Sequence, residues 1–125
     1  MLQAVNRPGA RPNPAHSQGM VATGTRTLYV AGQVGIDGDG GAADGIEAQT
    51  RAALVNVESV LTAGGMGMAD VAKLTVYLTQ EEDMAGFVRA FTPCLPSPPP
   101  AGTLVFVKAL ASPQYLVEIE AIAVR

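Results

Sequence analysis

Two carboxylates, Glu118 and Glu120, stand close together near the C-terminus and are the residues best suited to chemistry. The segment 115–124 is rich in β-branched and aromatic residues, which favours a strand. Its period of two places both glutamates on one face, between Leu116 and Ile122, and leaves the opposite face wholly apolar. Glutamate is uncommon inside strands and like charges repel, so we expect a partner or a function to hold this pair.

Glu118 is the candidate general base, because apolar neighbours in a cleft raise the pKa of a carboxyl group toward values useful for proton transfer. A solvent-facing carboxylate paired with Lys108 is the alternative. Glu120 is interpreted as a structural residue that bonds to another subunit. His16, the only histidine, is either a functional residue or a surface residue in a mobile arm. Its neighbour Ser17 does not complete a hydrolase triad, because adjacent side chains of an extended segment point to opposite sides.

Length and composition bound the class of protein. A chain of 125 residues forms one domain, and 48% hydrophobic residues is high for a small monomer, which favours an oligomer. The net charge of −3 without a basic run argues against nucleic-acid binding, and no apolar run reaches the roughly 18 residues of a membrane span. One cysteine, Cys94, and no signal peptide predict a cytoplasmic protein. No base neighbours Cys94, so its thiol is interpreted as inert.

The elements that must position these residues follow the order β-β-α-β-α-β-β, after an extended arm over residues 1–14. Strands are expected at 19–22, 27–34, 71–79, 98–108 and 115–124. The first two are expected to form a hairpin, and the last two to be neighbours. The Asp-Gly-Asp-Gly-Gly loop at 37–41 is interpreted as a solvated turn, because it lacks the later ligands and the closing Glu of a Ca²⁺ loop.

Two helices are expected between these strands. Asp44 with Glu47 has the form of a capping box, apolar residues recur at helical spacing over 50–61, and Gly64–Gly65 ends the helix. A second capping box over 79–82 precedes an apolar stripe made of Met84, Phe87, Val88 and Phe91, which Pro93 ends. The fold class is therefore α+β: a single mixed sheet with two helices packed on one face.

Five segments in this order resemble the RidA/YjgF family of reactive-intermediate deaminases. They are His16–Gln18, Val30–Gln33, Ile46–Arg51 with Asn56 after it, Lys73–Thr79 and Leu116–Val124. The resemblance implies a chorismate-mutase-like fold assembled as a homotrimer, with three clefts between subunits. In the family these clefts hydrolyse enamines and imines derived from amino acids to a 2-keto acid and ammonia, without a metal or organic cofactor. The family's water-activating carboxylate falls on Glu118, and backbone N–H groups near Gly32 would polarise the substrate.

The resemblance is broken at the substrate pocket. The family's Pro-Ala-Arg-Ser/Thr motif is Pro-Ala-Gly-Thr here, which leaves Gly102 in place of the carboxylate-binding arginine and Thr103 after it. Losing a charge-assisted contact costs about 1.5–3 kcal/mol per bond, so a changed substrate is expected. Ala31 replaces the serine before the cleft glycine, and His16 replaces a tyrosine. The other cations considered as replacements are Arg51, Lys73 and Arg89, which are more typical of solvated surface charge.

Two functions remain open at this point. The first is a homotrimer that binds a small imine or carbonyl metabolite and hydrolyses it with Glu118, the substrate lying against His16, Ala31, Gly32, Gly102 and Thr103. The second is a trimer that binds a small ligand or another protein and has lost deaminase activity with the arginine. Ribonuclease activity, which has also been attached to the family, is disfavoured because capture of RNA needs a basic stripe.

Overall fold

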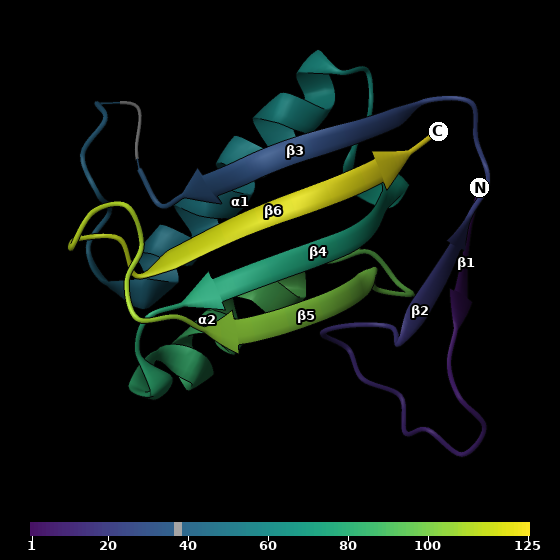
Figure 1. Ribbon diagram of the computed structural model, residues 1–125, viewed down its shortest axis with the longest axis horizontal. Coiled ribbons are helices and arrows are strands. Elements are labelled where there is room, and N and C mark those ends of the chain that lie inside the picture. The colour runs from purple at the N-terminus through teal and green to yellow at the C-terminus, as the bar shows by residue number, and fades with distance from the viewer. Residues whose placement is uncertain (37–38) are drawn as a thin grey trace.

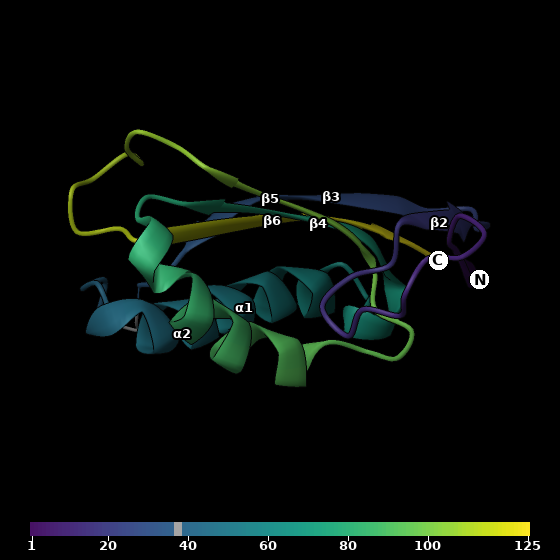
Figure 2. The ribbon, with the colours of Figure 1, turned by 90° about the horizontal axis from the view of Figure 1, so that it is seen from below.

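The structure is a computed structural model that describes residues 1–36 and 39–125, and it places two helices on one face of a mixed sheet (Figures 1 and 2). The strands are β1 (Leu2–Val5), β2 (Gly19–Ala22), β3 (Thr27–Val34), β4 (Val71–Leu78), β5 (Ala101–Phe106) and β6 (Val117–Val124). The helices are α1 (Gly45–Ala63) and α2 (Met84–Phe91), with short 3-10 turns at Met68–Asp70, Glu81–Asp83 and Thr92–Cys94. Asp37 and Gly38, which belong to the turn expected at 37–41, lie outside the described residues.

The main sheet confirms the expected α+β class. Its strand order is β3-β6-β4-β5, with β6 antiparallel to both neighbours and β5 parallel to β4. The alternation of β6 is as expected: Val117, Ile119, Ala121 and Ala123 are buried, and both glutamates lie on the other face. Because both helices cover the buried face, the face that carries the glutamates has no helix over it (Figure 2).

The first helix buries most of the positions predicted from its spacing, whereas the second buries Phe87 and Phe91 and leaves Met84 and Val88 exposed. From α1, Ala53, Leu54, Val57 and Leu61 enter the core, and Gly65 adopts a φ of 75° just after the helix, where a left-handed residue is favoured. From α2, the rings of Phe87 and Phe91 stack with their centres 4.7 Å apart. No helix among the described residues is long and apolar enough to cross a membrane.

The expected capping boxes are wrong. Asp44 is the N-cap residue of α1, but its side chain makes no capping hydrogen bond. Glu47 instead forms an ion pair with Arg89 of α2, at 3.3 Å between Oε1 and Nε, so it joins the two helices. The second helix begins with the 3-10 turn Glu81–Asp83, which also lacks a side-chain cap.

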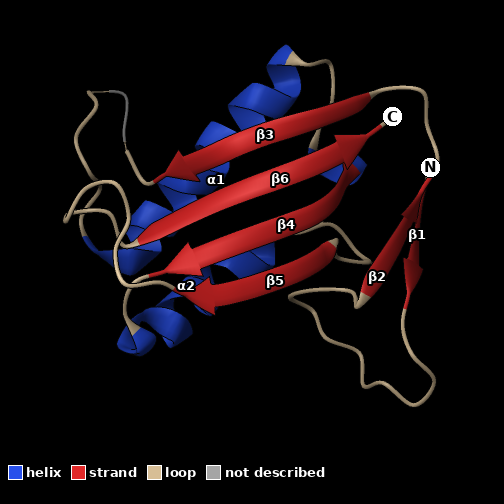
Figure 3. Cartoon of the chain, in the orientation of Figure 1, coloured by secondary structure: helices blue, strands red, loops and turns tan. Residues whose placement is uncertain are grey.

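Two expected strand pairings are wrong. β5 and β6 are not neighbours, because β4 lies between them (Figure 3). The connection from β4 to the parallel strand β5 passes through α2, as a parallel pair requires, and β6 then enters between β4 and β3. The short connection between β5 and β6 suggested that the two strands are adjacent, but it passes β4, which lies between them.

The expected hairpin of β2 with β3 is also wrong. β2 pairs with β1, which lies inside the segment expected to be an extended arm, and the two form a separate two-stranded sheet. The turn after β2 is held instead against the C-terminus. The backbone N–H groups of Thr25 and Arg26 donate to the carbonyl oxygen of Arg125 at 3.0 and 2.9 Å. These bonds direct β3 onto β6 rather than back along β2.

Candidate functional site

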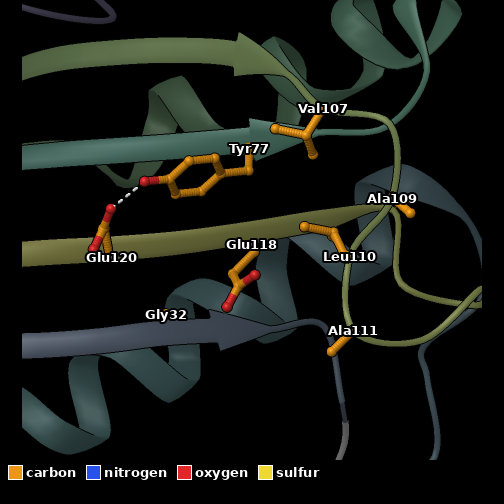
Figure 4. Close-up of a pocket in the computed structure, with 8 residues that line it drawn as sticks. All are labelled: Gly32, Tyr77, Val107, Ala109, Leu110, Ala111, Glu118 and Glu120. Atoms are coloured by element: carbon orange, nitrogen blue, oxygen red, sulfur yellow. Dashed lines mark hydrogen bonds between the residues drawn. The ribbon is translucent and has the colours of Figure 1, made fainter.

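A pocket of about 410 Å³ lies on the open face of the sheet around the two glutamates of β6 (Figure 4). Tyr77 of β4 and Gly32 of β3 lie on either side of them, and the segment after β5 closes one end. The residues that line the pocket are Gly32, Tyr77, Val107, Ala109, Leu110, Ala111, Glu118 and Glu120. The carboxylates therefore stand against an apolar wall formed by Val107, Ala109, Leu110 and Ala111.

The apolar wall is fixed from the other side of the sheet by Gln49. This residue of α1 is 2% exposed, and its side-chain amide donates to the carbonyl of Gln114 at 2.8 Å and accepts from the N–H of Leu116 at 2.9 Å. Both partners lie in the connection that leads from the pocket wall into β6. A buried helix residue thus determines where this connection runs.

A β-bulge in β3 shapes the floor of the pocket. Val30 pairs with Ala121 and Gln33 with Ile119, so two residues of β3, Ala31 and Gly32, stand opposite a single residue of β6. Both are exposed. The bulge therefore presents Gly32 at the pocket, whereas Ala31, the other predicted contact on this strand, is exposed but is not among the residues that line it.

Gly32 is needed because the Glu118 side chain lies directly over it. A Cβ at position 32 would overlap the Glu118 carboxylate and lie 2.8 Å from its Cδ. Any other residue in this position would displace the carboxylate. The bulge and the glycine together set the place of the candidate general base.

The two glutamates have different environments. Glu118 is half-buried and makes no hydrogen bond or ion pair with any residue that the structure describes, and the pairing considered with Lys108 does not form. Glu120 accepts a hydrogen bond from the hydroxyl of Tyr77 in the same chain, where the sequence analysis expected a bond to another subunit. Neighbouring carboxylates with unequal partners are suited to unequal roles. Glu118 is the one left available for proton transfer.

Tyr77 is the site residue that sequence reasoning missed. It stands opposite Glu118 across β4 and β6, while its hydroxyl reaches Glu120 (Figure 4). The hydrogen bond to Glu120 raises the pKa of Tyr77, and partial desolvation and the negative charges of Glu120 and Glu118 raise it further. The alternation of β4 already placed Tyr77 on the polar face, but only the register with β6 brings it to the glutamates.

We expect Tyr77 to ionise above its ordinary pKa of 10.0. The stabilising contribution of the neutral hydroxyl is then fully present below pH 10.0 and is lost as the pH rises through the raised pKa. Ultraviolet titration of tyrosinate checks this, since Tyr77→Phe should remove the late part of the absorbance change and Glu120→Gln should shift it to lower pH. An unchanged late phase in Tyr77→Phe would contradict the assignment.

A second group of predicted residues gathers at the start of β5. Ser17 is buried, its N–H donates to the carbonyl of Pro100 at 2.9 Å, and its hydroxyl donates to the carbonyl of Pro99 at 2.6 Å. These bonds hold His16 over Gly102, where a Cβ would lie 2.9 Å from the histidine Cβ. A hydrolase triad with Ser17 and His16, rejected from the sequence, is excluded here as well, because the serine hydroxyl donates to the backbone.

His16 and Gly102 line a groove of about 440 Å³ between β5 and α2. Its residues are Asn13, Ala15, His16, Leu74, Val76, Met84, Phe87, Val88, Phe91, Gly102, Thr103 and Leu104. Met84 and Val88, which were expected in the apolar stripe of the second helix, are 40% and 39% exposed and form the rim of this groove. The groove is thus mainly apolar, with His16 at one end.

One chain does not bring all the predicted site residues together. Gly102 pairs with Leu74, which is buried on the helix side of the sheet, whereas Glu118 lies on the open face. Thr103, the next residue, points to the open face, where its hydroxyl accepts from the Lys73 ammonium at 2.6 Å. The predicted residues therefore form two groups on opposite faces of the sheet.

The remaining candidates lie outside both groups. Arg89 is paired with Glu47, Arg51 is exposed on α1, and Cys94 is exposed with its thiol 3.5 Å from the carbonyl of Ala90. Within residues 1–36 and 39–125, no three His, Cys, Asp or Glu side chains are grouped so that they could hold a metal ion.

Fold and site together define a class: a small two-layer α+β domain that presents a carboxylate pocket on the uncovered face of its sheet. The family model described as Endoribonuclease L-PSP matches residues 8–125. A crystal structure of a protein of unknown function in the conserved Rid protein family, from Yersinia pestis, has 31% identity and a TM-score of 0.85, and the match covers 99% of this chain and 98% of that one.

Two curated relatives agree with this match. A RutC family protein from Pyrococcus horikoshii is 34% identical over 114 residues, which is 90% of each chain. The 2-iminobutanoate/2-iminopropanoate deaminase of Rattus norvegicus is 33% identical over 113 residues, which is 89% of this chain and 80% of the relative. The chain therefore belongs to the Rid/YjgF family, whose family model carries the endoribonuclease description. The resemblance seen in the sequence is confirmed.

Proposed function

We propose that this protein is a homotrimer that hydrolyses an imine or enamine of a small metabolite in clefts between its subunits. The observation that carries the proposal is the Glu118 carboxylate, which lies over the Gly32 bulge beside an apolar wall with no bonding partner among the described residues. The name of the relative from Rattus norvegicus, a 2-iminobutanoate/2-iminopropanoate deaminase, supports the reaction class.

The division of the site between two faces supports an assembly. A substrate that touches both Glu118 and Gly102 must lie between two copies, because one chain holds these residues on opposite sides of its sheet. The open face also carries the exposed apolar side chains of Tyr29, Val105 and Ile122, which are 74%, 40% and 36% exposed. A sheet face of this kind is favourably covered by another subunit.

The reaction requires one activated water. Glu118 takes a proton from water while the water oxygen bonds to the imine carbon, and the electron pair of the C=N bond moves onto nitrogen, which receives that proton. The hydroxyl of the resulting carbinolamine then gives its proton to Glu118 as the C–N bond breaks. The proton returns to the departing nitrogen, which leaves as ammonia, and the carbonyl product remains. Backbone N–H groups of the β3 bulge are the proposed donors that polarise the substrate.

Substrate choice follows from position 102 and its surroundings. Glycine there provides no cation for a carboxylate on the reacting carbon, and His16 fills the space beside it. The groove next to both residues is lined mainly by apolar side chains. These features support an imine with an apolar body in place of a compact 2-imino acid, with His16, Ala31, Gly32, Gly102 and Thr103 as the proposed contacts.

A non-catalytic role as a ligand-binding or protein-interaction trimer is the second candidate. Gly102 in place of the family arginine favours it, because a family member that lost its carboxylate contact can retain the scaffold and its clefts without turnover. No RNA or membrane partner is part of either proposal.

The decisive experiment measures ammonia release by the purified protein from two matched imines, one with and one without a carboxylate on the imine carbon. We expect turnover of the uncharged imine, and a mass of three chains by sedimentation. No turnover of either imine, together with saturable binding of the product carbonyl compounds, would select the binding protein instead. Faster turnover of the 2-imino acid would contradict the role given to position 102.

A further inference from the structure

The loop between β1 and β2, residues 6–18, is basic in a chain that is otherwise acidic. It contains Arg7 and Arg11, and the first acidic residue of the whole sequence is Asp37, although the chain carries a net charge of −3. Such a separation of charge along a sequence concentrates positive potential on one part of the surface. The segments that resemble the family include only residues 16–18 of this loop.

The loop is held in shape by its own hydrogen bonds. The backbone N–H of Arg7 donates to the side-chain oxygen of Gln18 at 2.9 Å. The backbone N–H of Gln18 donates in turn to the side-chain oxygen of Asn6, also at 2.9 Å. The N–H of Ala15 donates to the side chain of Asn13 at 2.8 Å. These bonds close the two ends of the loop onto each other, so its polar side chains surround a common space.

That space is a cavity of about 420 Å³ lined mainly by polar groups. The lining residues are Asn6, Arg7, Gly9, Ala10, Arg11, Asn13, His16 and Gln18. The guanidinium groups of Arg7 and Arg11 form no hydrogen bond or ion pair with a residue that the structure describes, and both residues are exposed. Two unpaired guanidinium groups beside side-chain amides are a suitable site for a carboxylate.

The polar cavity and the apolar groove meet at Asn13 and His16, which line both. Beyond His16 the groove offers Met84, Val88 and Leu104 as apolar surface. A cationic loop therefore leads directly into an apolar groove, and the join passes beside Gly102. A ligand that complements both parts has an anionic end and an apolar body.

We propose that the loop 6–18 supplies the cation that position 102 lacks, and that the protein binds an organic acid whose carboxylate lies between Arg7 and Arg11 and whose apolar body fills the groove along α2. The inference rests on the proposed function in taking this acid as the substrate or its product. It also changes the substrate class: the acid group lies at a distance from the reacting carbon rather than on it. Asn13 and Gln18 orient the carboxylate through their amide groups.

Calorimetric titration with 4-phenylbutanoate, 4-phenylbutan-1-ol and acetate tests the proposal. We expect the phenyl acid to bind at least about tenfold more tightly than either the alcohol, which lacks the charge, or acetate, which lacks the body. The double variant Arg7→Gln/Arg11→Gln should weaken binding of the acid at least about tenfold and leave the alcohol unchanged. Arg51→Gln, which removes an exposed arginine from α1, is the matched control and should bind like the wild type.

Raising the salt from about 20 to about 500 mM NaCl gives an independent measurement, since screening should weaken binding of the acid and spare the alcohol. Equal binding of acid and alcohol, or undiminished binding of the acid by the double variant, would overturn the proposal. If the wild-type protein binds to anionic lipid vesicles but does not bind the free acid, the proposal is overturned as well, and the loop is instead a membrane-binding surface.

Hydrolysis assays run in parallel separate this inference from the proposed function. If the acid binds through the arginines but no imine is hydrolysed, the proposed function fails and the inference stands as a binding site. The assays use imines that carry a phenyl ring and a carboxylate distant from the imine carbon. If the wild type hydrolyses these imines and the double variant does so with unchanged KM, the inference fails and the hydrolase stands. A raised KM for acidic imines alone supports both.

Discussion

Glu118→Gln is expected to lower the rate of imine hydrolysis at least about 10²-fold, the contribution typical of a general base. Glutamine keeps the shape of the side chain over Gly32 but has no basic oxygen. Because Glu118 makes no hydrogen bond or ion pair with a described residue, its replacement should change the free energy of unfolding by less than about 0.5 kcal/mol. Ammonia release gives kcat, and urea denaturation gives the stability.

Two further variants make this result specific. Glu81→Gln replaces an exposed carboxylate in a 3-10 turn outside the pocket and should leave kcat unchanged. Gly32→Ala leaves Glu118 in the chain but displaces its carboxylate, because the added Cβ would overlap it, and kcat should fall. Retention of more than half of the wild-type rate by Glu118→Gln would show that another group activates the water.

The layers of the fold could be predicted because they depend on local patterns. The strict alternation of β6 and the helical spacing of apolar residues in α1 each identify the buried face of one element without reference to any other. The strand order could not be predicted in the same way. It depends on contacts such as those of Thr25 and Arg26 with Arg125, which join residues about a hundred positions apart and leave no mark on local periodicity.

The candidate site was predictable to the same extent. Alternation placed Glu118 on the polar face of β6, but the hydroxyl of Tyr77 meets Glu120 only through the register of β4 against β6. The register of β5 against β4 likewise decides that Gly102 lies on the helix side, away from Glu118. Spacing along one strand shows which of its residues share a face. It cannot show which residues of the neighbouring strand lie beside them, because that depends on the register.

The pairing of Gly102 with His16 gives the second large expected effect. Gly102 has no left-handed φ, so alanine fits its backbone, but the added Cβ would approach the Cβ of His16 to 2.9 Å. Ser17 fixes His16 through bonds to Pro99 and Pro100, which leaves little freedom to relieve this contact. We expect Gly102→Ala to lower the free energy of unfolding by about 1–3 kcal/mol, the usual cost of overpacking.

A double-mutant cycle in urea denaturation tests this contact. His16→Gly should restore most of the stability lost in Gly102→Ala, with a coupling energy of at least about 1 kcal/mol. Gly67→Ala is the matched control: its φ is −143° and nothing lies within 4 Å of the added Cβ, so little or no stability should be lost. Additive effects of the two substitutions would show that the residues do not touch. If the coupling is found, Gly102→Arg alone cannot rebuild the family's carboxylate site, because the arginine side chain must leave through the space that His16 occupies, and only the pair Gly102→Arg/His16→Gly can.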